Sequence, residues 1–199
     1  MHINCRLVFE KYAKPFFKSN MRILEIGPDG HPSTFRQMLD LDRVRWETLD
    51  IFNDGRVTYV AADEHAFPVP DGTFDVVFSN QVIEHVRKPW LWIKENARVC
   101  KKNGRVITLC PVSWPYHEAP VDCWRIYPEG MKSLYEEAGL TLEICRLESL
   151  ERVQAKEVWP GIGAVREESP KINFRDRLRR FFGWPQTVAF DTIAVGVKL

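Results

Sequence analysis

The stretch that decides the fold is RILEIGPDG, residues 22–30. Its first five residues form a short apolar run with a β-branched bias, and Gly27-Pro28-Asp29-Gly30 then interrupts regular structure. Glycine in such a turn lets the backbone bend tightly and approach a ligand closely. We therefore expect a strand over residues 22–26 and a functional loop directly after it, although an ordinary strand-to-helix turn has the same pattern.

Apolar runs of this kind alternate with helical periodicity along the rest of the chain. The pattern predicts helices over residues 5–17, 34–41, 89–100 and 128–138, and further strands over residues 45–49, 58–62, 74–78, 105–109, 141–147 and 190–197. The run 74–78 holds one acid among apolar residues, which is typical of a strand buried on both faces. Strands separated by helices of this length indicate a parallel, doubly wound sheet.

Local signals predict where two of these helices begin and end. Ser33 is suited to cap a helix that begins at Thr34. Pro89 suits the first position of the helix after residue 88. The segment Lys101-Lys102-Asn103-Gly104 predicts a cationic last turn and a glycine stop for that helix.

Composition narrows the class of protein. The 199 residues fit one domain, since domains have roughly 100–200 residues, and the net charge of +1 argues against a protein that mainly coats nucleic acid. The longest uncharged stretch, residues 106–117, is shorter than the about 20 residues of a membrane-spanning helix. Charged residues interrupt the N-terminal region, so we find no signal core and expect a cytoplasmic protein.

The cysteines and histidines show no metal-ligand spacing. The five cysteines form no Cys-x-x-Cys pair, and the histidines show no His-Glu-x-x-His pattern. We therefore expect the cysteines to be small buried side chains and expect no metal site.

Acidic residues follow the predicted strands where ligands bind in open α/β sheets, beyond the carboxyl ends of the strands. Asp50 follows the second strand, and Asp63 and Glu64 follow the third. Each alone fits a helix cap or a solvated turn. Together they suit ribose hydroxyls and an exocyclic amine, as in a nucleoside. They do not suit a polyphosphate, and the chain has no Gly-Lys-Ser/Thr phosphate loop.

Four ordered segments resemble the class I S-adenosylmethionine-dependent methyltransferases, in particular their type 11 branch. The segments are Leu24–Gly30, Ala62–Val77, Ile83–Val86 and Arg98–Arg105. The resemblance covers roughly residues 20–147. It implies a Rossmann-like, doubly wound seven-stranded sheet, mostly parallel with an antiparallel last strand and helices on both faces. One departure is that Asp29 and His31 stand where the family usually has its second and third glycines.

The resemblance also implies S-adenosylmethionine as the cofactor and assigns residues to it. Glu25 would orient the first loop and face the methionine amino group, while Asp50 would hold the ribose and Asp63 the adenine amine. The full implied set is Glu25, Gly27, Gly30, Asp50, Ile51, Asp63, Glu64 and Asn80.

Methyl transfer from a sulfonium mainly requires alignment, and a hydroxyl acceptor also benefits from a general base. His85 and His117 are the candidate catalytic residues, and Glu84 and Asp122 also qualify by residue type. The alternatives are a histidine that packs and bonds the backbone at position 85 and an ordinary loop histidine at position 117.

Residues 120–130 are similar to a segment of bacterial methyltransferases of surface-glycan and small-molecule biosynthesis. This makes Asp122, Trp124 and Arg125 candidate contacts of a small-molecule, sugar or lipid-linked glycan acceptor. The alternative is structural, with Trp124 in the core and Arg125 paired with an acid.

Residues 151–186 lie between the last two predicted strands, so we expect one domain over 1–199 with an insertion or lid at 151–186. Its segment 171–182 combines five cations with Leu178, Phe181 and Phe182 on one helical face. That suits peripheral membrane contact or closure over a pocket, and equally a solvated helix packed on the sheet.

These observations predict a methyltransferase that uses S-adenosylmethionine on a small-molecule or glycan-type acceptor, by O-methylation. Two alternatives remain. One is a non-catalytic nucleoside-binding or interaction module on the same fold. The other is an NAD-dependent oxidoreductase, which is disfavoured because the chain has no Tyr-x-x-x-Lys dyad and no room for a substrate domain.

Overall fold

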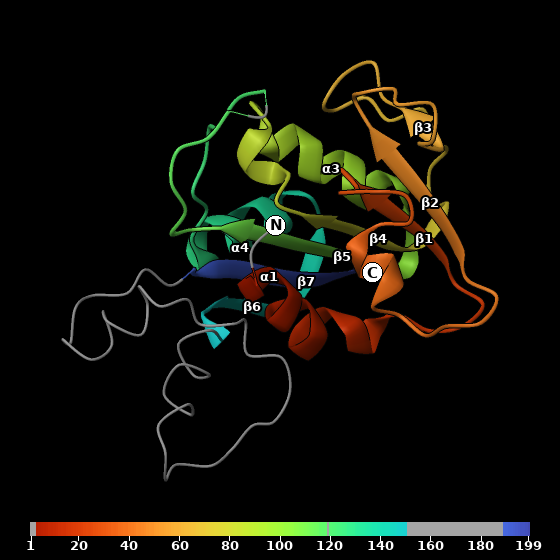
Figure 1. Cartoon of the computed structure of the whole chain (residues 1–199), viewed down its shortest axis with the longest axis horizontal. Helices are drawn as coiled ribbons and strands as arrows, with labels where there is room; N and C mark the ends of the chain where they lie inside the picture. The colour runs from red at the N-terminus through yellow and green to blue at the C-terminus, as the bar shows by residue number, and fades with distance from the viewer. Residues whose placement is uncertain (1–2, 119, 151–188) are drawn as a thin grey trace, which may run out of the picture.

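A seven-stranded sheet forms the centre of the protein (Figure 1). The computed structural model describes residues 3–118, 120–150 and 189–199. In chain order, the strands are β1 (Arg22–Ile26), β2 (Arg45–Asp50), β3 (Tyr59–Val60), β4 (Phe74–Asn80), β5 (Cys100–Pro111), β6 (Leu140–Glu148) and β7 (Asp191–Lys198). Their spatial order is β3-β2-β1-β4-β5-β7-β6. Strands β1 to β5 pair in parallel and β7 is antiparallel to both its neighbours, which confirms the predicted fold class.

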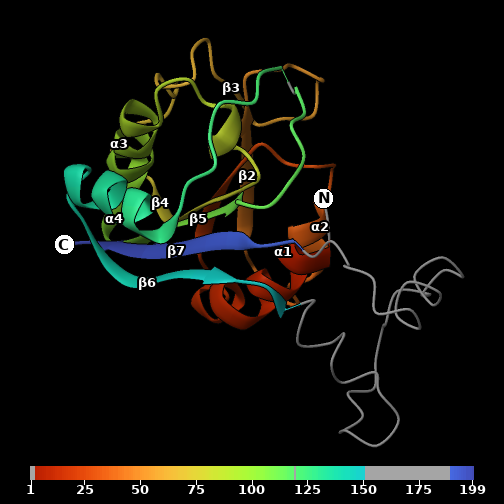
Figure 2. The same cartoon turned by 90° about the vertical axis from the view of Figure 1, so that its left-hand side faces the viewer.

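Helices cover both faces of this sheet (Figure 2). In chain order they are α1 (Ile3–Val8), the π-helical η1 (Phe9–Ala13), the 3₁₀ segment η2 (Lys14–Phe16), α2 (Thr34–Gln37), the 3₁₀ segment η3 (Ile83–His85), α3 (Pro89–Val99) and α4 (Pro128–Glu137). Side chains of α1 and α2 pack with Ile23, and those of α3 and α4 pack with Leu24. Successive residues of β1 thus serve opposite cores, as the period of a strand requires.

Two predicted helices differ from the observed ones. The first is confirmed as helical but divides into α1, η1 and η2. The second ends at Gln37 instead of residue 41, because 3₁₀-type hydrogen bonds close its last turn, from Met38 N to Phe35 O and from Leu39 N to Arg36 O. Its predicted cap is confirmed, since the Ser33 side chain accepts a hydrogen bond from Arg36 N.

The prediction that residues 101–104 end a helix was wrong. Helix α3 ends at Val99, and Cys100 already pairs with Phe74 in the sheet. Gly104 instead lets two strands pass closely, because a Cβ atom there would lie 2.9 Å from Asp75 O and 2.8 Å from Cys100 Sγ. Lys101, expected to favour the helix end, donates to the Asp75 carboxylate at 2.7 Å.

The predicted insertion at 151–186, with its segment 171–182, lies outside the described residues and stays a prediction, as does the division into one domain. Among the residues that the structure describes, no helix has the length and apolar character needed to cross a bilayer.

The loop after β1 leaves the sheet at Gly27, which has a φ of +65°. Its N–H donates to Leu49 O of β2 at 2.9 Å. A Cβ atom at this position would lie only 2.5 Å from Cγ2 of Val82, which follows β4. Residue 27 must therefore be glycine both for its backbone angle and for the space that Val82 occupies.

We expect Gly27→Ala to destabilise the fold by more than the roughly 1–2 kcal/mol that a left-handed conformation costs a residue with a Cβ atom. Gly72→Ala is the matched control, because Gly72 has a φ of +59° but no atom within 4 Å of the position that a Cβ would take. Urea unfolding measures both losses, and adding Val82→Ala should recover part of the loss at Gly27. Equal losses in Gly27→Ala and Gly72→Ala would show that the Val82 contact is unimportant.

A buried carboxylate holds the same loop against the sheet. Glu25 Oε2 accepts hydrogen bonds from Ser33 Oγ at 2.5 Å and from Trp46 Nε1 of β2 at 2.8 Å. Asp29 adds a second bond to the start of α2, since its carboxylate accepts from the N–H of Thr34 at 2.8 Å. Burial raises the pKa of Glu25 from its ordinary 4.5 to about 7.

We expect Glu25→Gln to change how stability depends on pH. Between pH 4.5 and about 7 the unfolded chain releases the Glu25 proton while the folded chain keeps it, so this group lowers stability as pH rises. The free energy of unfolding of the wild type should fall relative to Glu25→Gln by about 3 kcal/mol across that window and level off above it.

Urea unfolding at pH 5 and pH 8 measures this difference, with Glu10→Gln as the control for loss of a surface charge. A difference between wild type and Glu25→Gln that is the same at both pH values contradicts the expectation.

Candidate active site

A cavity of about 220 Å³ opens beyond the carboxyl ends of β1, β2 and β4. Apolar side chains form most of its wall, namely Ile26, Leu49, Phe67, Val82, Val86 and Trp92. Polar groups lie at its rim, where the strands end. The cavity thus occupies the position at which open α/β sheets bind their ligands.

Five of the residues proposed from the sequence line this cavity: Gly27, Asp50, Ile51, Glu64 and His85. Asp50 lies at the end of β2, and its Oδ1 accepts a hydrogen bond from Phe52 N at 3.0 Å. Glu64 accepts from the backbone N–H of Arg87 at 2.9 Å and pairs with its guanidinium at 3.1 Å. Both carboxylates are therefore held in position by the chain around them.

The other proposed cofactor residues lie outside the lining of this cavity. Asp63 lines an adjoining hollow that shares Ile51 and Glu64 with the cavity, and its carboxylate lies 3.0 Å from His65 Nδ1. Glu25 acts on the first loop from the opposite face of β1, and Gly30 and Asn80 do not reach the cavity wall.

Nine of the fourteen cavity-lining residues were not proposed from the sequence, among them Phe52, Gln81 and Val82. Gln81 follows β4 directly and has a φ of +55°, so its side chain turns away from the strand direction. Its Nε2 donates to the Asp191 carboxylate of β7 at 3.1 Å. The strand-end rule that selected Asp50 also applies to Gln81 and offers the signal that would have found it.

Segment η3 brings Glu84 and His85 to the other side of the cavity. His85 Nδ1 lies 2.5 Å from the carbonyl oxygen of Val121. Glu84 is fully buried, and among the described residues neither of its carboxylate oxygens has a hydrogen-bond partner. Burial raises the pKa of Glu84 to about 8.

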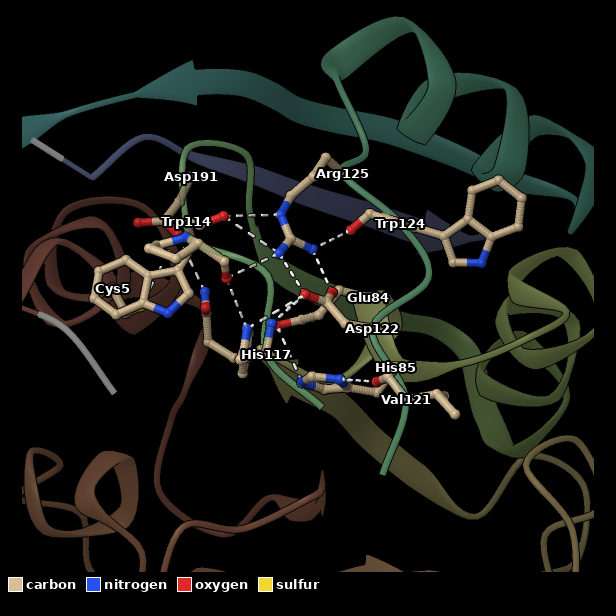
Figure 3. Close-up of polar contacts among 12 residues, drawn as sticks. Cys5, Glu84, His85, Trp114, His117, Val121, Asp122, Trp124, Arg125 and Asp191 are labelled. Carbon is tan, nitrogen blue, oxygen red and sulfur yellow. Dashed lines mark hydrogen bonds and ion pairs between the residues drawn. The ribbon is translucent and has the colours of Figure 1, made fainter. Parts of the chain in front are cut away.

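Residues 112–118 and 120–127, called the loop 112–127 below, follow β5 and are tied to η3. The carbonyl oxygen of Glu84 accepts from the N–H groups of Cys123 and Trp124 at 2.7 and 3.2 Å, and the indole N–H of Trp124 donates to Val86 O at 2.9 Å. These bonds place the rings of His85 and His117 edge to face, with centroids 5.0 Å apart (Figure 3).

An ion pair fixes the shape of this loop. Arg125 donates to both oxygens of the Asp122 carboxylate, at 2.5 and 2.6 Å, and the pairing lowers the pKa of Asp122 to about 2. Asp122 also accepts from the backbone N–H of His117 at 2.8 Å. Arg125 therefore pairs with an acid, as the structural alternative expected. Trp124 does not fill the core, because it is 39% exposed.

The three proposed acceptor residues share a second, more open hollow of about 310 Å³. Its wall consists of Trp114, Tyr116, Asp122, Cys123, Trp124 and Arg125. Three of these are aromatic and exposed, so the hollow offers flat apolar faces beside an ion pair.

Comparison with known proteins agrees with this geometry. Residues 35–108 match a family model described as a methyltransferase domain. A stretch of 53 residues is 38% identical to 27-O-demethylrifamycin SV methyltransferase of Amycolatopsis mediterranei, and covers 27% of this chain. The matched stretch spans only 20% of the length of that relative.

Solved structures show the same fold across the chain. A SAM-dependent methyltransferase from Archaeoglobus fulgidus superposes with a TM-score of 0.60 at 16% identity, over 98% of this chain and 94% of its own. The [4+2]-cyclase SpnF superposes with a TM-score of 0.61 at 17% identity, over 98% of this chain and 80% of its own. Residues 35–108 thus match a methyltransferase domain, and the described part of the chain has the fold of S-adenosylmethionine-dependent methyltransferase structures.

Proposed function

We propose that this protein transfers a methyl group from S-adenosylmethionine to a small-molecule or glycan-type acceptor, most simply to an oxygen atom. The observation that carries the proposal is the cavity itself, because Gly27 and Asp50 meet at its edge at the ends of neighbouring strands. The match of residues 35–108 to a methyltransferase domain supports the choice of cofactor.

Each part of the cofactor has a suitable place along this cavity. The Asp50 carboxylate would accept hydrogen bonds from the ribose hydroxyls, and Ile51 would pack on the adenine ring. Glu64 and Asp63 would face the adenine edge from the adjoining hollow. Gly27 would let the backbone approach the methionine part closely, while Glu25, Gly30 and Asn80 would act by shaping the loops.

The acceptor would enter from the side of the loop 112–127, near His85 and His117. Because the leaving group of a sulfonium is neutral, the protein mainly has to align the attacking atom with the methyl carbon, and alignment contributes about 7–11 kcal/mol. The imidazole of His85 lines the cavity, so it is the group best placed to accept the proton of a hydroxyl acceptor. Trp124 would provide an apolar face for a ring, with Asp122 and Arg125 as polar neighbours.

We expect Asp50→Ala to weaken the binding of S-adenosylhomocysteine about ten- to a hundredfold, because a charge-assisted hydrogen bond contributes roughly 1.5–3 kcal/mol. Asp63→Ala should have a smaller effect, since Asp63 lies outside the cavity wall. Isothermal titration calorimetry measures both.

Asp54→Ala is the control, because this acid lies on the same loop but bonds Arg56 outside the cavity. Unchanged affinity in both Asp50→Ala and Asp63→Ala would rule out the proposed cofactor site. Binding of NAD in place of S-adenosylhomocysteine would favour the oxidoreductase alternative.

We expect His117→Ala and Trp124→Ala to leave the affinity for S-adenosylhomocysteine within about twofold but to lower turnover, because both residues lie on the acceptor side. A screen of hydroxylated small molecules and sugars, read by the mass gain of one methyl group, identifies the acceptor for this measurement. Loss of cofactor binding in folded variants would place these residues elsewhere. Cofactor binding without any methylated product would favour a non-catalytic module.

A further inference from the structure

Three side chains that can bind metal ions converge between η3 and the loop 112–127. Glu84, His85 and His117 each offer one ligand atom, and these atoms all lie within 4.8 Å of one another. Glu84 Oε1 and His85 Nε2 are 3.7 Å apart. Figure 3 shows the three side chains close together beside the Asp122–Arg125 pair.

Both histidines have the ring hydrogen bond that is typical of metal ligands. His85 Nδ1 lies 2.5 Å from Val121 O, and His117 Nδ1 lies 3.1 Å from Pro115 O. A carbonyl oxygen only accepts hydrogen bonds, so each Nδ1 carries the ring proton and each Nε2 keeps its lone pair. A histidine that binds a metal almost always donates its other ring N–H to a carbonyl or carboxylate in this way.

The third side chain provides an independent observation. The Glu84 side chain is 1% exposed, and among residues 3–118, 120–150 and 189–199 neither carboxylate oxygen accepts a hydrogen bond. A buried polar group without a partner is costly, and native structures seldom leave one without a reason. A cation beside Glu84 Oε1 would provide the missing partner.

We propose that Glu84, His85 and His117 bind one divalent first-row transition metal ion. Two imidazoles and one carboxylate favour such an ion over Mg²⁺, which prefers oxygen ligands and water. Ligand atoms of a tetrahedral ion with bonds of about 2.0 Å lie about 3.3 Å apart. Small rotations of these side chains would therefore bring the three ligand atoms, now within 4.8 Å of one another, to the spacing that an ion requires.

The site is incomplete without an external ligand, because three protein ligands leave at least one position open. With the ion bound, His85 Nε2 is a ligand and no longer acts as the base. As a consequence that rests on the proposed function, an acceptor hydroxyl bound at the open position, beside the cofactor cavity, would then lose its proton to solvent more readily because the metal lowers its pKa. Metal binding itself is tested without cofactor or acceptor, so failure of one proposal leaves the other measurable.

The experiment titrates Zn²⁺ into the metal-free protein by calorimetry and Co²⁺ by visible absorption. We expect one ion per chain, with d–d absorption bands of bound Co²⁺, and clearly weaker binding of Mg²⁺. Glu84→Gln and His117→Gln should each weaken Zn²⁺ binding by more than the roughly 10–100-fold that loss of an outer-shell partner costs. Circular dichroism checks that each variant folds, and His117 is the safer position because its side chain is 38% exposed.

Two matched controls separate this site from other metal ligands. His65→Gln removes an imidazole that pairs with Asp63, and Cys123→Ser removes an exposed thiol next to Asp122, so both should keep full affinity. Absence of Zn²⁺ and Co²⁺ binding at micromolar concentrations overturns the proposal. So does a site whose affinity depends on Cys123 or His65 and is unchanged in His117→Gln.

Discussion

The pairing of β1 with a parallel strand on each side is the constraint on which the rest of the molecule depends. The chain goes from β1 to β2 in one direction and later returns to place β4 on the other side. Helix α2 therefore lies on one face of the sheet and α3 on the other. The loop after β1 and the loop after β4 lead to opposite faces of the sheet. The cavity lies between these two loops. Gly27 and Val82 meet where these loops separate.

Two buried glutamates, Glu25 and Glu84, differ in the hydrogen bonds that their carboxyl groups make. The Glu25 carboxylate accepts hydrogen bonds from Ser33 and Trp46, and these bonds hold the loop after β1 against the sheet. Glu84 uses its backbone oxygen to hold the loop 112–127, while its side chain has no hydrogen-bond partner within the described part of the chain. The hydrogen bonds of the first group stabilise the loop, while its ionisation lowers stability as pH rises. The second is a cost to stability that only a ligand would offset.

The fold could be predicted because periodicity and strand ends are local signals. The apolar run 74–78 became the buried strand β4, and the acid at position 50 lies where β2 ends. Local signals gave the wrong prediction for residues 101–104. A glycine and two lysines fit the end of a helix as well as they fit a strand that passes close to its neighbour. Only the packed neighbour of Gly104, the backbone of Asp75, distinguishes the two. The approach of His117 to His85 was equally invisible, because His117 lies on a segment without periodicity and backbone bonds to Glu84 set the path of that segment.

The place of β7 in the sheet has a consequence for how the protein is made. Strands β5 and β6 do not touch as neighbours, since β7 lies between them and pairs Arg105 with Val197 and Leu140 with Lys198. Until residues 191–198 are added, β5 and β6 both lack the strand that lies between them in the described part of the chain, β7. Strands that are far apart in the sequence pair slowly, and an unpaired strand edge can pair with strands of other chains. The half of the sheet around the cavity, β1 to β5, can therefore pair before β7 is made, while β6 joins the sheet only through β7.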